Sequence, residues 1–329
     1  MSSPHNLSVP TPTEQNLARR TRPTKNDLAD RLFRYLMYAA SGISVAILLL
    51  MGWIITGQAL PAIKQFGLGF LVSREWNVPD LQFGALPLIF GTLGSGLISL
   101  IFAIPIGLAV AIVTSEDLLP HWLRTSIAFT IELLAAIPSV VFGLWGFYTL
   151  IPVLLPVQQF LYTKFGTTIP LFSTEPSGSG LLTAGMLLGI MILPTLAAVS
   201  REVLLVVPSY LRTGSMALGA TRWETIFRVV LPKAFSGIIG AIMLALGRAL
   251  GETMAVTMVI GNAENISPSV FSPAYSIPAI LANTFAEAQE DIHVGALTYL
   301  VLILFLLTLT VNIGAIGLVR LVERGEKSS

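Results

Sequence analysis

The sequence predicts an all-α membrane protein with six transmembrane helices. Two observations support this prediction. Hydrophobic residues make up 54% of the 329 residues and charged residues only 11%, whereas about a quarter of a typical soluble globular protein is charged. The charged residues are also clustered, so that long uncharged segments separate them, and a helix needs about 20 mostly apolar residues to cross a bilayer. Four such segments are residues 35–63, 81–115, 133–163 and 176–200.

The six helices are expected at residues 32–56, 85–114, 127–155, 180–206, 235–260 and 295–319. The first follows the basic N-terminal region. The second and third are longer than one straight span requires, so part of each is expected to tilt or to lie at the membrane interface. The fourth is uncharged up to Arg201 near its end, the fifth contains Arg248 and Glu252, and the sixth is uncharged throughout.

Basic residues predict the orientation of these spans. An even number of spans places both termini on one side of the membrane. Fifteen of the 19 Lys and Arg residues fall on the side of the termini and three on the opposite side, with Arg248 inside a span. The positive-inside rule then places both termini in the cytoplasm. Residues 1–31 are polar and lack the apolar core of a signal peptide, so we expect a disordered cytoplasmic tail there and a transmembrane domain over residues 32–329.

Several kinds of site are not expected on this chain. It has no cysteine, which excludes a disulfide framework and a cysteine-based metal or redox site. Its three histidines, His5, His121 and His293, lie in three different regions, so no histidine metal site is expected. The chain also lacks the glycine-rich phosphate loop of nucleotide-binding proteins. We therefore expect no metal and no cofactor on this chain.

The cytoplasmic loop at about residues 207–234 predicts two short helices with a break between them. Gly219 allows a sharp turn, and Thr221 with Glu224 three residues later has the spacing of a capping box. Pro232 stands where the fifth span begins. The apolar residues that recur at helical spacing after the turn are Trp223, Ile226, Phe227 and Val230. Such a helix either docks in a groove of a partner protein through its tryptophan or lies on the lipid surface.

Two opposite charges, Arg248 and Glu252, lie inside the fifth predicted span. Four residues apart on a helix, they share a face and can touch, and Gly247 and Gly251 beside them allow a neighbouring helix to approach closely. A lone charge at the centre of a span costs about 2.5–3.5 kcal/mol. The pair therefore either locks this helix against a neighbour or serves an anion path, in which Arg offers a planar fork for phosphate-like groups. Glu132 is a third ionisable group at or near membrane depth.

The cytoplasmic loop resembles the EAA loop of the permeases of ABC importers. In that pattern a glycine precedes an aliphatic residue and a terminal Leu-Pro pair at fixed spacing, and Gly219, Val229 and the pair Leu231-Pro232 match it. The Glu-Ala-Ala part departs, because residues 213–215 are Thr, Gly and Ser. The resemblance implies a fold like that of type I ABC importer permeases and a loop that couples to an ATPase. The residues expected in this coupling loop are Ala217, Gly219, Thr221, Arg222, Trp223, Phe227, Leu231 and Pro232.

Longer segments are similar to the phosphate permease subunits of these importers. They include "ELLAAIPSVVFGLWG" at residues 132–146, "LALGRALGETMAVTMVIGN" at residues 244–262 and "SIPAILANTFAEA" at residues 276–288. The resemblance covers roughly residues 85–319. It implies half of a translocation path for inorganic phosphate, with Arg248 and Glu252 along it and Glu132 as a third candidate.

The same resemblance implies a set of partners in the bacterial cytoplasmic membrane. They are a second permease subunit (PstA-like) in a heterodimer, two ATPase subunits (PstB-like), which use the ATP, and a periplasmic phosphate-binding protein (PstS-like). The chain itself is then a transporter subunit in the lipid bilayer, with no enzymatic activity and no contact with nucleic acid.

The last loop on the periplasmic side, at about residues 262–294, carries four acidic and no basic residues. Within it, residues 276–288 predict a short helix, because Ser276 can cap it and Pro278 suits its first turn. One side of this helix consists of Ile277, Ile280, Leu281 and Phe285. We expect that side to contact the binding protein or to cover the outer mouth of the path; the alternative is a helix resting on the bilayer surface.

Other functions compete with phosphate import. The arginine fork would suit any tetrahedral anion, so a permease for sulfate, molybdate or phosphonate is the alternative substrate assignment. An ion-coupled secondary carrier is the alternative class, although such carriers usually contain internal repeats and the sequence shows no clear one. An intramembrane enzyme would need a nucleophile with a base, or a metal site, within the spans, and Arg248 with Glu252 supplies neither.

Overall fold

The computed structural model describes residues 27–116 and 118–326, and their regular secondary structure is helical. The chain divides into two units, residues 1–54 and residues 55–329. Among the described helices, six are long and apolar enough to cross a membrane, which confirms the predicted all-α architecture with six spans. Residues 1–26, most of the predicted tail, lie outside the described residues.

The first unit is described from Asp27 onward, as the N-terminal part of helix α2 (Asp27–Phe66). The helix therefore begins before residue 32, the predicted start of the first span. Its large apolar side chains are exposed, among them Trp53 at 78%. A helix that is apolar on all sides is typical of a membrane span, so this exposure agrees with a lipid environment.

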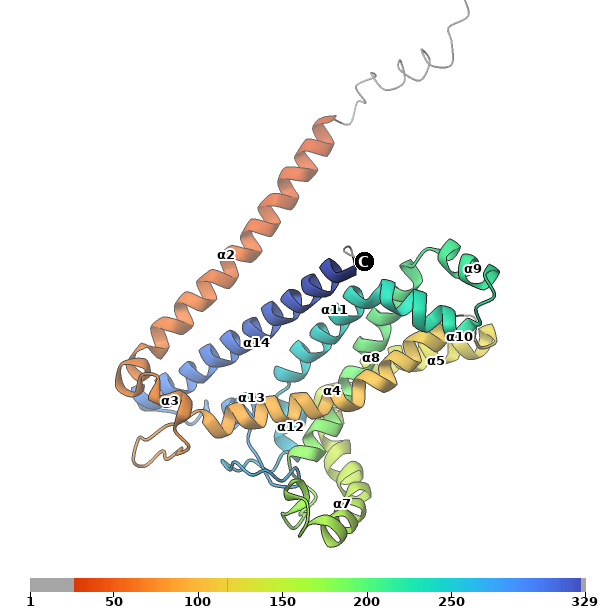
Figure 1. Cartoon of the computed structure of the whole chain (residues 1–329). Helices are drawn as coiled ribbons and strands as arrows, with labels where there is room; N and C mark the ends of the chain where they lie inside the picture. Colours follow the sequence, from red (N-terminus) through yellow and green to blue (C-terminus); the bar gives the residue numbers. More distant parts are fainter. Residues whose placement is uncertain (1–26, 117, 327–329) are drawn as a thin grey trace, which may run out of the picture. The chain divides into compact units, whose positions relative to one another are not determined.

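Within the second unit, the helices are arranged as Figure 1 shows. They are α3 (Gly69–Val72), α4 (Leu86–Ser115), α5 (His121–Ala135), α6 (Ser139–Trp145), α7 (Ile151–Phe165), α8 (Leu181–Val206), α9 (Ser209–Ala217), α10 (Arg222–Thr225), α11 (Leu231–Leu250), α12 (Met254–Val259), α13 (Ile277–Thr284) and α14 (Asp291–Glu326). Two π-helical turns, Gly146–Leu150 and Ile226–Val230, join α6 to α7 and α10 to α11, and a 3-10 turn spans Pro170–Phe172. Helices α9 and α10 lie at one end of the transmembrane helices and α12 and α13 near the other; we call these the α9 end and the α13 end.

Helices α4 and α8 form the centre of this unit, because they contact each other more extensively than any other pair of described helices. Small residues allow their close approach. A Cβ atom on Gly185 would lie 2.4 Å from Cγ2 of Ile98, and one on Gly107 would lie 2.9 Å from Cδ2 of Leu196. Such contacts are the usual means of packing helices in a membrane, where no hydrophobic force drives helices together.

The third predicted span, residues 127–155, is wrong. Helix α5 ends at Ala135, residues 136–138 are not helical, and the membrane-length helix runs instead over Ser139–Phe165. Pro138 explains the break, because a proline ring disfavours helical backbone in the residue before it. Glu132 therefore lies on α5, before the span and not inside it.

The fifth predicted span, residues 235–260, is wrong at both ends. The membrane-length helix begins already at Arg222, since α10 passes through the π-helical turn into α11, and it ends at Leu250. Residues 251–253 then separate α11 from α12. Gly251 caps the end of α11, and glycine favours a helix less than any residue except proline. Arg248 consequently lies in the last turn of α11, whereas Glu252 lies in the connection beyond it.

At the α13 end, the segment before α13 packs closely on α4. A Cβ atom on Gly91 would lie 2.1 Å from the carbonyl oxygen of Tyr275. Two residues later, the backbone N–H of Ile277 donates a hydrogen bond to Oγ1 of Thr92 at 2.9 Å. The backbone of this segment therefore contacts α4 directly, at the backbone of Gly91 and the hydroxyl of Thr92.

The short helix predicted at residues 276–288 is confirmed as α13, and the hydroxyl of Ser276 accepts a hydrogen bond from the N–H of Ala279 as its cap. Two residues of the apolar side predicted for this helix face the interior of the chain, and contact of the helix with the binding protein stays a prediction. Ile277 and Ile280 are completely buried in a core shared with α2, α4 and α14, so their burial inside the chain leaves them unavailable to a partner. Phe285, the last residue of that side, is half exposed.

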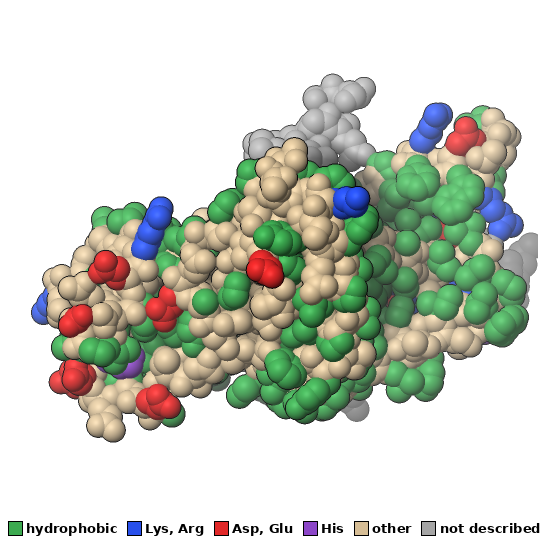
Figure 2. All heavy atoms as spheres, turned by 90° about the horizontal axis from the view of Figure 1, so that it is seen from below, with side chains coloured by type: hydrophobic (Ala, Val, Ile, Leu, Met, Phe, Trp, Pro, Cys, Tyr) green, Lys and Arg blue, Asp and Glu red, His purple; other side chains and the backbone are tan. Residues whose placement is uncertain are grey.

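Charged side chains are sparse on the surface of the molecule. Figure 2, seen from the lower side of Figure 1, shows broad hydrophobic areas between a few separate charged side chains. Large apolar side chains of the membrane-length helices, such as Trp145 and Tyr148, are exposed. Exposed apolar surface on this scale indicates contact with lipid or with other membrane chains.

Candidate functional site

The predicted coupling loop forms the α9 end of the molecule. Gly219, at a φ of +91°, turns the chain between α9 and α10, in a left-handed conformation that other residues rarely adopt. The capping box is confirmed: Oγ1 of Thr221 accepts the N–H of Glu224 at 3.3 Å, and the carboxylate of Glu224 accepts the N–H of Thr221 at 2.8 Å. The remaining predicted loop residues delimit the helices: Ala217 ends α9, Arg222 begins α10, and Leu231 and Pro232 begin α11.

The predicted apolar stripe of this loop is divided between two environments. Ile226 and Val230 are buried against the ends of α4 and α8. Trp223 and Phe227 are 55% and 58% exposed, and their rings stack with centroids 6.0 Å apart. The π-helical turn Ile226–Val230 has more residues per turn than an α-helix. A sequence pattern based on the regular α-helical period therefore does not predict which of these residues are buried. The exposed part of the predicted stripe is therefore the aromatic pair and not the whole stripe.

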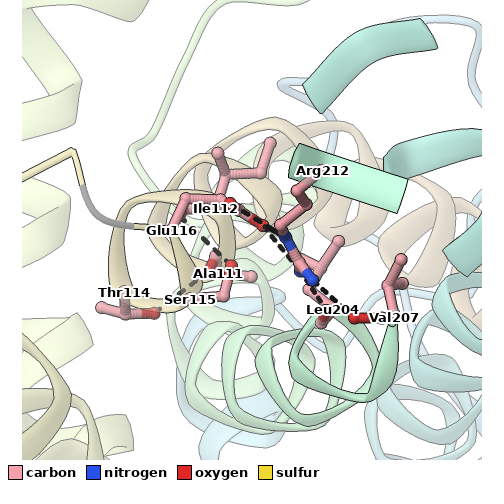
Figure 3. A network of polar contacts seen from close by, with 8 residues as sticks. All are labelled: Ala111, Ile112, Thr114, Ser115, Glu116, Leu204, Val207 and Arg212. Atoms are coloured by element: carbon pink, nitrogen blue, oxygen red, sulfur yellow. Dashed lines mark hydrogen bonds and ion pairs between the residues drawn. The ribbon is translucent and has the colours of Figure 1, made fainter. Parts of the chain in front are cut away.

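A partly buried ion pair, which no sequence pattern predicted, joins this loop to the transmembrane helices (Figure 3). Arg212 of α9 donates to both carboxylate oxygens of Glu116, with Nη2 at 2.9 Å and Nε at 3.1 Å from Oε1. Its remaining bonds go to the carbonyl oxygens of Leu204, at 2.8 Å, and Val207, at the carboxyl end of α8. The two side chains are 18% and 13% exposed. Because the partners are 96 residues apart, no local spacing could have revealed the pair.

A groove of about 760 Å³ lies between α11 and α14, which run in opposite directions (Figure 1). Arg248 and Asn312 line one end of it, and Ser236 and Arg320 line the other. The residues between these ends are apolar or glycine. The arrangement is a largely apolar groove with a cationic side chain at each end.

Arg248 lines this groove without the ion pair that its spacing predicts. Its Nη1 donates to Oγ1 of Thr195 on α8 at 3.0 Å, and among the described residues no carboxylate forms an ion pair with it. Glu252, beyond the end of α11, instead accepts a long hydrogen bond of 3.4 Å from the N–H of Ala255 at the start of α12. The predicted pairing of the two charges is wrong because the helix ends between them, so they do not occupy one continuous helical face.

Glu132, the third predicted residue, lies apart from the groove. It borders a small cavity of about 30 Å³ together with Thr114 of α4 and Arg201 of α8. Arg201 donates to the carbonyl oxygen of Thr114 at 3.5 Å and forms an ion pair with the adjacent Glu202 at 3.1 Å. Of the three residues predicted for a substrate path, the structure thus places Arg248 on the groove wall, Glu252 just past its helix, and Glu132 at a different position.

Comparison with known proteins identifies relatives over most of the chain. Residues 103–328 match the family described as the binding-protein-dependent transport system inner membrane component. A protein of Mesorhizobium japonicum named phosphate transport system permease protein PstC is 43% identical over 288 residues, which is 85% of this chain and 87% of that protein. The protein of the same name from Pasteurella multocida is 41% identical over 304 residues, 90% of this chain and 94% of the relative.

Solved structures show the same fold at low sequence identity. A bacterial ABC transporter involved in the import of the acidic polysaccharide alginate matches with a TM-score of 0.54 and 19% identity, over 88% of this chain and 97% of that chain. An inward-facing MetNI methionine ABC transporter matches with a TM-score of 0.51 and 19% identity, over 75% of this chain and 99% of the other. At this identity the likeness concerns the fold alone.

Proposed function

Because the chain belongs to the family of binding-protein-dependent transport system inner membrane components, and within it to the PstC permeases, we propose that it forms half of the path by which an ATP-driven importer carries inorganic phosphate. As a family member it is a multi-pass component of an ABC importer in the inner membrane, and ATP is hydrolysed by a separate subunit. The family therefore implies an ATPase and a binding protein as partners. The specific assembly that we propose contains a PstA-like permease, two PstB-like ATPases and a PstS-like phosphate-binding protein.

The observation that carries the assignment of substrate path is the environment of Arg248. Its guanidinium has a neutral hydroxyl, that of Thr195, as its hydrogen-bond partner and faces a groove that is otherwise largely apolar. Arginine carries five N–H donors in a planar fork that matches phosphate, so this contact leaves donors for a passing anion. An intramembrane charge is costly and usually functional, which favours this role over a purely structural one.

Glu252 would act on the same anion by repulsion. Its carboxylate lies four residues beyond Arg248, and its contact in the structure is a weak backbone hydrogen bond. A negative charge close to the path lowers the affinity of the arginine for phosphate, and a path must release its ion as well as bind it. Glu132 remains a candidate for a separate step, because it borders a different cavity.

The coupling role belongs to the α9 end in this proposal, and that end faces the cytoplasm. The excess of Lys and Arg on the side of the termini supports this orientation. Trp223 and Phe227 present a stacked, half-exposed aromatic pair, and aromatic side chains of this kind are common anchors in protein interfaces. We assign the pair to a groove of the ATPase, which supplies the ATP chemistry, so that this chain needs no cofactor of its own.

Purification and transport measurements test the proposal together. The chain is purified in mild detergent, its partners are identified by mass spectrometry, and the complex is reconstituted in vesicles with the binding protein. We expect ATP-dependent uptake of radioactive phosphate that excess unlabelled sulfate, molybdate or phosphonate does not displace. Uptake driven by an ion gradient without ATP would show that the protein is a secondary carrier. Displacement of labelled phosphate by another anion would show that the other anion is also a substrate.

A further inference from the structure

We infer that Arg212 is a positioning residue that fastens the coupling helix α9 to transmembrane helices α4 and α8, so that movement imposed on the loop reaches those helices. The inference rests on the proposed function, because it assumes that an ATPase moves this loop. It assigns to one side chain a role in coupling that is separate from substrate binding and from contact with the ATPase.

The first argument is the number of elements that this side chain joins. Its guanidinium bonds Glu116, the residue that ends α4, through both carboxylate oxygens. It also donates to the carbonyl oxygens of Leu204 and Val207 at the end of α8. Figure 3 shows the arginine reaching from α9 into the space between these two helix ends. One side chain therefore connects three helices.

The second argument is that little else holds α9. None of its residues is buried, and Leu218 just after it is 92% exposed. Apart from Arg212, the partly buried Leu211 packs toward the ends of α4 and α8, whereas most other contacts of α9 are with α10 and the π-helical turn of the same loop, such as the hydroxyl contact of 3.0 Å between Ser215 and Thr225. A helix with so few apolar contacts would otherwise move independently of the spans.

The third argument is the chemistry of the pair. A bidentate contact between guanidinium and carboxylate fixes both orientation and distance, which a single point charge does not. The carboxyl end of a helix carries partial negative charge and unpaired carbonyl groups, so the cation of Arg212 also satisfies the end of α8. The pair is mostly shielded from water, and salt screens such pairs less than exposed ones.

Two substitutions separate the two links. Glu116→Gln keeps the size of the side chain and removes its charge, which weakens the link to α4 and leaves the carbonyl contacts to α8. Arg212→Gln removes both links. The matched control is Glu202→Gln, which removes a nearby and more exposed ion pair, that of Arg201 with Glu202.

The complex of this chain with its partner permease, ATPases and binding protein is assembled in vesicles, and phosphate uptake and ATP hydrolysis are measured in the same sample. We expect Arg212→Gln to keep hydrolysis that the binding protein stimulates and to lower the phosphate taken up per ATP by about tenfold, within the usual range for coupling between distant sites. Glu116→Gln should lower the same ratio by a smaller factor, and Glu202→Gln should leave it unchanged.

A merely structural role would give a different result, namely a parallel loss of uptake, hydrolysis and assembled complex with the ratio unchanged. That outcome in either variant, or a normal ratio in both, overturns the inference. Spin labels give a second measurement that needs no transport. Since the chain contains no cysteine, labels on Tyr210→Cys in α9 and Ala109→Cys in α4 report one distance, and Arg212→Gln should broaden its distribution.

The spin-label measurement also separates this inference from the proposed function. If the unmodified complex hydrolyses ATP but takes up no phosphate, the substrate assignment fails. The inference is then decided by the label distances alone, with and without ATP. A distribution that Arg212→Gln leaves unchanged in both states refutes the link between α9 and α4, whatever the transported molecule is.

Discussion

Two arginines, at the two regions for which we propose a function, have different surroundings. At the α9 end, Arg212 bonds a carboxylate and two backbone carbonyl groups and is mostly buried. Beside the groove between α11 and α14, Arg248 bonds one neutral hydroxyl and has no ion-pair partner among the described residues. Four of the five N–H groups of Arg212 donate hydrogen bonds, whereas one N–H group of Arg248 does.

This difference distinguishes an arginine that stabilises the structure from an arginine that can bind a ligand. A guanidinium with four of its five donors engaged can fix helices but has little capacity for another acceptor. A guanidinium held by one hydroxyl is oriented and still able to bind an anion. Buried or intramembrane charge alone therefore does not identify a substrate site; the number of acceptors already bound to the charge does.

The largest expected effect tests the open arginine. Arg248→Leu should lower ATP-driven phosphate uptake about 100-fold or more, because hydrogen bonds to a charged group contribute about 1.5–3 kcal/mol each and the fork supplies two. Arg248→Lys keeps the charge without the fork and should lower uptake by a smaller factor. Uptake is measured in vesicles and divided by the amount of assembled complex.

A double substitution provides the control for this prediction. Arg248→Leu combined with Glu252→Leu removes both charges, and it should transport as poorly as Arg248→Leu alone, since the two residues form no ion pair in the structure. Near-normal uptake by the double variant would mean that the arginine only neutralises the glutamate, and the contrast between the two arginines would then be lost.

A second effect concerns the outer surface of the region that Arg212 holds. Trp223→Ala should weaken ATPase docking by about 2 kcal/mol, the typical contribution of an aromatic anchor, while the buried Ile226 keeps the loop packed on α4 and α8. The measurement is the affinity of the ATPase for the purified permease pair. If the ATPase binds the unmodified permease pair and the Trp223→Ala variant with equal affinity, the aromatic pair faces lipid and not a protein.

A smaller effect sharpens the comparison at the groove. Thr195→Val keeps the shape of the side chain and removes the one acceptor that orients Arg248. A neutral side-chain hydrogen bond contributes about 1 kcal/mol net. The KM for phosphate uptake should therefore rise by about fivefold, with little change in kcat. A loss as large as that of Arg248→Leu would mean that Thr195 itself binds the anion.

The smallest effect concerns the turn beside Arg212. Thr221→Ala removes the capping box and should raise the population of the opened loop about fivefold, as the loss of an N-cap usually does. Hydrogen exchange of the amides at residues 222–225 measures this population.

Local sequence signals predicted much of the fold. Composition and uncharged segments predicted six spans, and short-range spacing predicted the capping box of Thr221 and the cap of Ser276, since both depend on residues three positions apart. The break before Pro138 also had a local signal, which the length of the apolar segment outweighed. The end of α11 at Leu250 was missed because glycine is common inside membrane helices and does not by itself mark an end.

The candidate site was less predictable, because its contacts join distant parts of the chain. Arg212 and Glu116 are 96 residues apart, and Arg248 and Thr195 are 53 residues apart. Neither distance has a sequence signature. Spacing predicted a partner for Arg248 on its own helix, and the tertiary packing of α8 beside α11 supplied a different one.

Helix α4 can transmit a rotation at one of its ends to the other end, as a rigid lever would. One end of it is held by Arg212 through Glu116, and near the other end Gly91 and Thr92 touch the segment before α13. From Thr92 to Glu116 the helix rises about 36 Å at 1.5 Å per residue. A tilt of about 5° around Glu116 would then displace Thr92 by about 3 Å. A small rotation at one membrane face thus becomes a displacement as long as a hydrogen bond at the other, and the length of the helix sets the ratio.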